Sequence, residues 1–189
     1  MSGATITGLV RFSYAAVFKP TAMNEGDTPK YSISLLIPKK DKKSLAKIKK
    51  AIKACMEDNK DSVFGGKIKG LKNPLRDGDE EREDQEAYEN MFFLNASSTR
   101  KPQILDRDMD PITEEEDFYS GCYGRASLNF FAYNRNGNKG IGVGLNNLQK
   151  IKDGERLGGG ATSAFDDFDD DFADQFDDFD DGDDDDDMF

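Results

Sequence analysis

The chain has 189 residues, a formal net charge of −12 at pH 7, two cysteines and no histidine. This length suits one domain over residues 1–160 followed by a tail over residues 161–189. Without histidine, Ser-His-Asp, Cys-His and HExxH chemistry are excluded, and two distant cysteines give no zinc-ligand pattern. We therefore predict a protein that is not an enzyme and needs no cofactor or metal, with Cys55 and Cys122 as reduced core residues.

The sequence also lacks an apolar run of about 18 residues, the length expected of a membrane-spanning helix. Its first residues, MSGATITGLVRFSY, do not follow the charged-then-apolar order of a signal peptide. We expect a soluble protein in the cytoplasm, without membrane contact.

Two strands are predicted at the start of the chain. Residues 4–18 read as one long strand, which Pro20 ends because proline has no donor for the ladder. Residues 31–37 alternate in the same way and form the second strand, which stops at Pro38. The residues that share one face of the first strand are Val10, Phe12, Tyr14, Ala16 and Phe18.

A helix is expected next, from the N-cap Asp41 to about Asp58, with lysines on its exposed side. Residues 39–72 hold twelve Lys against four acidic residues, which indicates either a solvated face or contact with nucleic acid. Residues 64–89 contain Gly65-Gly66, Pro74 and an acidic run, so they are interpreted as an exposed acidic insertion. The predicted buried side of the helix consists of Leu45, Ile48, Ile52, Cys55 and Met56.

Three further strands fit residues 91–97, 119–133 and 140–149, with a hairpin turn at residues 134–138 that contains Asn and Gly. Five strands and a helix without βα alternation predict a mainly β protein with one or two helices, an OB-fold-like antiparallel barrel with insertions. The helix precedes the third strand, whereas it usually follows that strand in an OB fold. The core candidates in the last strand are Ile141, Val143, Leu145 and Leu148.

One face of the strand over residues 119–133 combines aromatic, basic and polar residues, a mixture that suits single-stranded nucleic acid because bases stack on rings and cations neutralise phosphates. The alternative is that the rings are core and the charges a solvated rim. Gly140, Gly142 and Gly144 are expected to leave one face of the next strand bare for a strand or a base. The predicted nucleic-acid-binding residues are Arg11, Tyr14, Lys39, Lys40, Arg100, Lys101, Tyr123, Arg125, Asn129, Phe131, Tyr133 and Lys139.

Asp106, Asp108 and Asp110 have the spacing of the first ligands of a calcium loop, and clustered carboxylates also occur in metal-dependent nucleases. Pro111 stands where an EF-hand needs glycine, and no lysine or histidine recurs with these acids in a nuclease pattern. We interpret the stretch as an exposed acidic turn.

Residues 161–189 hold fifteen Asp, six Phe and no Lys or Arg, so removing their charge from −12 leaves +3 on residues 1–160. Carboxylate repulsion and scarce apolar surface predict that the tail is disordered by itself. Rings among carboxylates resemble bases among phosphates, which makes the tail a candidate competitor for a basic groove and a candidate partner-binding segment. Its phenylalanines are Phe165, Phe168, Phe172, Phe176, Phe179 and Phe189.

Five stretches together resemble the OB-fold single-stranded DNA-binding proteins of tailed bacteriophages, over most of residues 4–160 and with the same kind of acidic tail. The resemblance implies a non-enzymatic protein that coats single strands in replication and recombination, in the cytoplasm of the infected bacterium. It further implies a tail that competes with DNA and contacts replication proteins. The stretches are RFSYAAVFKP, KYSISLLIPKK, FFLNASSTRKPQILDRD, FYSGCYGRASLNFFAY and NKGIGVGLNNLQKIKDGERLGGG.

The leading hypothesis is therefore sequence-tolerant binding of single-stranded DNA, with replication and recombination proteins as tail partners. The alternative is an acidic-tailed interaction or assembly factor that does not bind DNA. The sequence leaves open whether the chain forms homo-oligomers.

Overall fold

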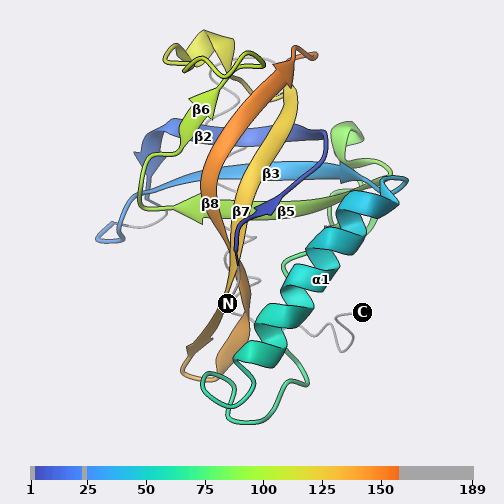
Figure 1. Ribbon diagram of the computed structural model, residues 1–189, viewed down its shortest axis with the longest axis vertical. Coiled ribbons are helices and arrows are strands. Elements are labelled where there is room, and N and C mark those ends of the chain that lie inside the picture. The colour runs from blue at the N-terminus through green and yellow to red at the C-terminus, as the bar shows by residue number, and fades with distance from the viewer. Residues whose placement is uncertain (1–2, 23–24, 158–189) are drawn as a thin grey trace.

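The computed structural model describes residues 3–22 and 25–157 as a small barrel with one long helix beside it (Figure 1). Five strands close into a ring in the order β2-β3-β5-β8-β7 and back to β2. Neighbours in the ring are antiparallel except β5 and β8, which pair in parallel. This ring confirms the predicted OB-like barrel. In chain order the elements are β1 Thr5–Ile6, β2 Val10–Thr21, β3 Lys30–Pro38, α1 Lys42–Asp58, β4 Arg76–Asp77, α2 Gly78–Glu81, η1 Glu86–Tyr88, β5 Met91–Ser98, β6 Gln103–Leu105, η2 Glu115–Asp117, β7 Tyr123–Arg135 and β8 Asn138–Lys152.

The first predicted strand is two strands, β1 and β2, so the prediction of one strand over residues 4–18 was wrong. At the break, the amide of Gly8 donates to Ser44 Oγ at 3.1 Å, and the amide of Ala126 donates to Thr7 Oγ1 at 3.0 Å. The two hydroxyl groups thus accept hydrogen bonds from amides that would otherwise pair with a neighbouring strand. β2 also continues through Pro20, which lies at the exposed end of the strand, where a missing donor is tolerated.

The alternation of β2 changes phase at Tyr14, whose φ of 47° is unusual for a residue with a side chain. Phe12 and Val17 are both buried although they are five positions apart, an odd spacing that would put them on opposite faces of a regular strand, and the pairing with β3 shifts register after Ser13. Ala16 is half-buried, so it does not share the burial of Phe12, with which the regular alternation had grouped it. A bulge of this kind cannot be seen in the apolar pattern alone.

The helix α1 begins where the sequence predicts. The Asp41 carboxylate accepts a hydrogen bond from the Ser44 amide at 3.1 Å, which caps the first turn. The predicted buried side of α1 is confirmed, because all five of its residues are buried against the barrel. Within residues 3–22 and 25–157, no helix has the length and apolarity that crossing a membrane would require.

Residues 64–89 pack against the barrel through a few apolar side chains, while most of their acidic side chains are exposed. Phe64, Leu71 and Tyr88 are buried. The Tyr88 hydroxyl lies 3.3 Å from the Oγ atoms of both Ser13 and Ser34, on β2 and β3. This segment therefore covers part of the outward side of β2 and β3.

The strands β7 and β8 form a long hairpin that extends past the barrel toward the far end of α1 (Figure 1). Its turn contains Asn136 with φ 53° and Gly137 with φ 96°, which confirms the positive-φ turn predicted there. β7 begins at Tyr123 and not at Tyr119, since a turn closed by the Cys122 amide and the Tyr119 carbonyl precedes it. The four core candidates of the last strand are buried, as predicted.

Candidate nucleic-acid interface

The outward face of β7 carries the aromatic and basic residues that the alternation predicts. Gly124, Ala126, Leu128 and Phe130 are buried, so the residues between them point away from the core. The side chains turned outward include Tyr123, Arg125, Asn129 and Phe131, with Tyr133 next along the strand. Phe131 is 46% exposed, which is unusual for a ring of its size.

The glycines of β8 do not leave a bare face, contrary to the expectation. A Cβ added at Gly142 would lie 2.4 Å from Phe131 Cζ, and one at Gly140 would lie 2.6 Å from the Tyr133 hydroxyl. The pairing places each of these glycines opposite the residue that covers it. The glycines therefore seat the rings of β7 directly on the β8 backbone, where aromatic side chains often compensate for missing side chains.

The ring of Tyr123 lies between two cations. The Arg11 guanidinium carbon is 5.4 Å from the ring centroid, and Lys152 Nζ is 4.8 Å from it. Arg11 is held there by its Nε, which donates to the Gly121 carbonyl at 3.1 Å, and its Nη2, which donates to the Glu155 carbonyl at 2.7 Å. Arg11 therefore keeps its charge without a carboxylate partner among these contacts.

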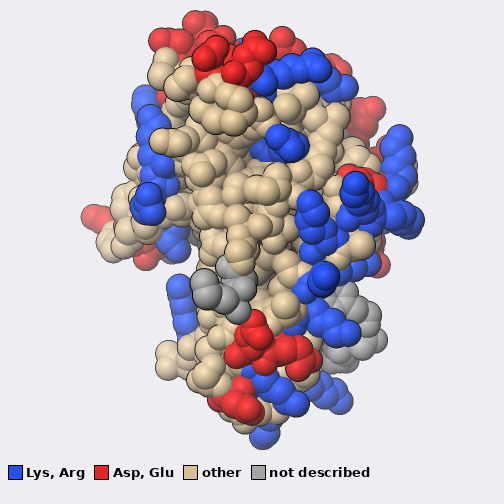
Figure 2. All heavy atoms as spheres, in the orientation of Figure 1, with Lys and Arg blue, Asp and Glu red and all other residues tan. Residues whose placement is uncertain are grey.

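Arg125 extends this row of cations. Its Nε and Nη2 donate to Gln149 Oε1 at 3.2 and 2.7 Å, so a neutral amide on β8 orients an exposed guanidinium. From Arg11 to Phe131, the outward side of the hairpin thus combines positive charge with exposed ring surface. In the view of Figure 2, this side appears as a largely uncharged band that contains a cationic patch, with further Lys and Arg gathered on both flanks.

Tyr119, Lys150 and Arg156 form a second cation and ring cluster that the sequence did not single out. Lys150 Nζ lies 5.1 Å and the Arg156 guanidinium carbon 4.1 Å from the Tyr119 centroid. The Tyr119 hydroxyl donates to Asp153 Oδ1 at 2.8 Å, and burial together with this carboxylate raises the pKa of Tyr119. The one sequence feature that could have pointed to this cluster is the alternation of Lys150 with Lys152 at the end of β8.

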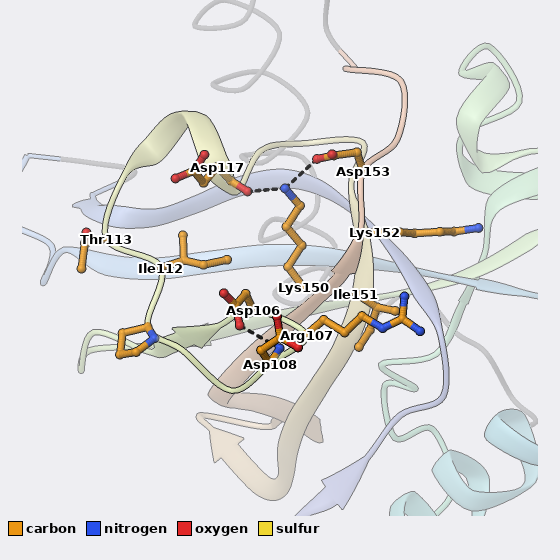
Figure 3. A pocket seen from close by; sticks show the side chains of 11 residues that line it. Asp106, Arg107, Asp108, Ile112, Thr113, Asp117, Lys150, Ile151, Lys152 and Asp153 are labelled. Carbon is orange, nitrogen blue, oxygen red and sulfur yellow. Dashed lines mark hydrogen bonds and ion pairs between the residues drawn. The ribbon is translucent and has the colours of Figure 1, made fainter.

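A hollow next to this cluster carries charges of both signs (Figure 3). Lys150 Nζ points between the Asp117 carbonyl and the Asp153 carboxylate, both at 2.6 Å. Burial opposes the charged form of Lys150, but the hydrogen bond to Asp153 and the negative charges of Asp153, Tyr119 and Cys122 together outweigh it, so the pKa of Lys150 is raised. With Lys150 neutralised locally and four Asp in its lining, this hollow suits a polyanion less than the hairpin face does.

Tyr14 and Lys39 are not brought to the hairpin face. The Tyr14 hydroxyl donates to Gln85 Oε1 at 3.0 Å, and its ring packs 6.4 Å from that of Tyr88. Lys39 Nζ contacts the carboxylates of Asp77 and Asp79, both at 2.7 Å, and these bonds raise the pKa of Lys39. Both residues thus contact residues 77–88 rather than the row on β7.

The remaining predicted cations lie at the ends of strands. Lys40 is exposed before α1, and Arg100 and Lys101 are exposed after β5, where Lys101 Nζ is 5.9 Å from the Phe18 ring. Lys139 is half-buried in β8 beside the hairpin turn. The tail phenylalanines lie outside the residues that the structure describes.

The acidic stretch at residues 106–110 forms a turn. Asp106 Oδ1 accepts hydrogen bonds from the amides of Asp108 at 2.8 Å and Asp110 at 3.0 Å, so the carboxylate stabilises the backbone. Among the described residues, no group of three or more Asp, Glu, Cys or His side chains is arranged to hold a metal ion.

Comparisons with known proteins agree on one family. The family model of the single-stranded DNA-binding protein of Enterobacter phage Enc34 matches residues 4–189. Protein p50 of Acyrthosiphon pisum secondary endosymbiont phage 1 is 33% identical over 168 residues, which cover 84% of this chain and 90% of that protein.

Two solved structures share the fold. The single-stranded DNA-binding protein from bacteriophage Enc34, solved in complex with single-stranded DNA, superposes with a TM-score of 0.69 and 28% identity over 81% of this chain and 88% of the other. Gp2.5, a single-stranded DNA-binding protein of bacteriophage T7, matches with a TM-score of 0.60 and 14% identity over 84% of this chain and 96% of the other, a likeness of fold alone. The chain therefore belongs to the family of the single-stranded DNA-binding protein of Enterobacter phage Enc34.

Proposed function

We propose that this protein binds single-stranded DNA without sequence preference and coats it during phage replication and recombination, as a binding protein and not an enzyme. The observation that carries the proposal is the outward row of the hairpin, where Tyr123 lies between Arg11 and Lys152 and Phe131 is exposed. The related Enc34 protein, solved with single-stranded DNA, supports it.

The binding mechanism follows from this row. Each base that stacks on an exposed ring contributes about 1 to 3 kcal/mol, and stacking accepts any base because every base has a flat face. Arg11, Arg125 and Lys152 supply charge for the phosphates that pass between the rings. Binding should therefore weaken steeply with salt, since neutralised phosphates release condensed counterions.

The acidic tail is proposed to compete with DNA for this surface and to bind replication and recombination proteins in the cytoplasm of the infected bacterium. Its fifteen Asp oppose the net charge of +3 on residues 1–160. Tail residues proposed to contact partners are Phe165, Phe168, Phe172, Phe176, Phe179 and Phe189.

A titration of labelled oligo-dT and of a duplex of equal length, at several salt concentrations, tests both the binding of DNA and the role of the tail. We expect tight, salt-sensitive binding of the single strand, and tighter binding at low salt when residues 161–189 are deleted. Absence of salt-sensitive binding by either form contradicts the proposed function. Equal affinities of the full and truncated chains contradict only the role of the tail as competitor.

A further inference from the structure

The exposed side of α1 carries six lysines that the interface on the hairpin does not use. Lys47 Nζ donates to the Ile6 carbonyl at 2.9 Å, and Lys49 Nζ lies 5.8 Å from the Phe92 ring. The side chains of the other four make no hydrogen bond, ion pair or ring contact within the described part of the chain. These four are Lys42, Lys43, Lys50 and Lys53, and together with Lys47 and Lys49 they are called the lysine face of α1.

The order of charges along α1 opposes the helix dipole. Apart from the cap Asp41, the first turn has no acidic residue and instead holds Lys42 and Lys43, and the last turn has no basic residue and ends in Glu57 and Asp58. Cations at the N-terminal end and anions at the C-terminal end both destabilise a helix. Folding alone therefore does not account for this arrangement.

Neighbouring lysines on the helix surface also repel one another. Lys43 and Lys47 are four residues apart, as are Lys49 and Lys53, and like charges at this spacing lower helix stability. No carboxylate of α1 stands among the six lysines. Because these lysines lower the stability of the helix, we expect an anionic partner to neutralise them.

The shape of the lysine face suits an extended anion. Seventeen residues span about 25 Å at a rise of 1.5 Å per residue, and the lysines are spread over the first twelve of them. Lys43, Lys47 and Lys50 follow one line along the helix, opposite its buried side. α1 contains no aromatic residue, so the contact it offers is with charge and not with bases.

Cationic side chains over α1 are visible from the side on which the hairpin crosses the barrel. In Figure 1, β7 and β8 cross in front of β2, β3 and β5, and α1 runs beside the hairpin. Figure 2, in the same orientation, shows Lys and Arg gathered over α1, at the edge of the uncharged band. A strand that leaves the hairpin can therefore continue over α1.

We propose that the lysine face of α1 is a second phosphate-binding surface, which holds the backbone of single-stranded DNA beyond the bases stacked on the hairpin. This inference rests on the proposed function and adds to it a longer site. A short strand occupies the hairpin alone, whereas a long strand contacts α1 as well.

The test uses the full chain, a variant with Lys43→Gln, Lys50→Gln and Lys53→Gln, and oligo-dT of about 8 and about 30 nucleotides, the first within and the second beyond the range of about 4 to 16 nucleotides bound per OB fold. For the long strand, we expect the slope of log K against log salt to fall by about 2 in the variant, since each lost phosphate contact removes about 0.7. For the short strand, affinity should change less than twofold. The same three positions changed to Arg form the matched control and should keep the wild-type slope.

Thermal unfolding separates this role from a structural one. Removing these lysines should leave the unfolding midpoint unchanged or raise it, because repulsion along α1 falls. If the triple variant does not fold, each single Gln variant should lower the long-strand slope by about 0.7.

Three results overturn the inference and leave the proposed function standing. The first is an unchanged slope on the long strand. The second is an equal loss of affinity for both strands. The third is an unchanged DNA slope with lost binding of a peptide of residues 161–189, which would assign the lysine face to an acidic peptide. If the wild-type chain binds neither strand, the proposed function itself fails.

Discussion

The ring of Phe131 lies directly on the backbone of Gly142, so that a Cβ at Gly142 would come within 2.4 Å of Phe131 Cζ. The same relation holds for Asn129 and Gly144, where the Cβ would lie 2.6 Å from Asn129 Oδ1. Glycine at position 142 thus sets the height and tilt of an exposed ring. Glycine at position 144 likewise sets the position of the Asn129 side-chain amide.

This pair of contacts predicts different effects for two similar substitutions. Gly142→Ala should push the Phe131 ring off the strand and weaken binding of single-stranded DNA by about 1 kcal/mol or more, the contribution of one stacked base. Gly144→Ala is the matched control and should cost less, because it displaces no ring. Fluorescence titration with oligo-dT measures both. Equal losses would argue against stacking on Phe131.

Tyr123 and Arg125 provide a second prediction. Replacing both with Ala should cost at least about 1 kcal/mol of DNA binding, because the change removes a ring and the charge beside it. Tyr123→Phe keeps the ring between Arg11 and Lys152 and should bind nearly as the wild type does. A correctly folded double variant with wild-type affinity would exclude this part of the hairpin from the interface.

The ion pair of Lys39 with Asp79 predicts a dependence of stability on pH. The bonds from Lys39 and from the Asn90 amide hold the pKa of Asp79 below its ordinary value of 3.8. The folded chain therefore binds fewer protons at this carboxyl than the unfolded chain does, so the stabilisation is complete above pH 3.8 and is lost as the pH falls below it.

Urea unfolding of the wild type and of Asp79→Asn over a pH series checks this dependence. The difference in unfolding free energy between the two should be constant at neutral pH and should shrink in acid. Glu80→Gln, on the same helix α2, is the control and should show no comparable change with pH. A difference in unfolding free energy that grows in acid would contradict the prediction.

The two cysteines should be unreactive in the folded protein. Burial raises the pKa of both thiols, and Cys55 is 4% and Cys122 0% exposed, so neither offers a thiolate to solvent. A colorimetric thiol reagent should detect almost no thiol in the native chain and two thiols per chain in denaturant. Rapid labelling of one thiol under native conditions would show that its site opens locally.

Patterns within a single element were predictable from the sequence. The buried side of α1 and its cap at Asp41 depend on neighbours three or four residues away, and the outward row on β7 depends on alternate residues. The bulge at Tyr14 escaped prediction because a single residue with positive φ reverses the alternation without changing the composition.

What the sequence by itself determined is the class of the fold, the charge of its parts and the chemistry of one strand face, because these follow from local periodicity and from counting charges. Only the tertiary structure decided which residues meet: Lys39 with Asp79, Arg11 with Tyr123, and the Phe131 ring with Gly142. Such partners are set by strand register and by chain closure around the barrel, which join residues from eleven to more than a hundred positions apart. No local pattern carries that information.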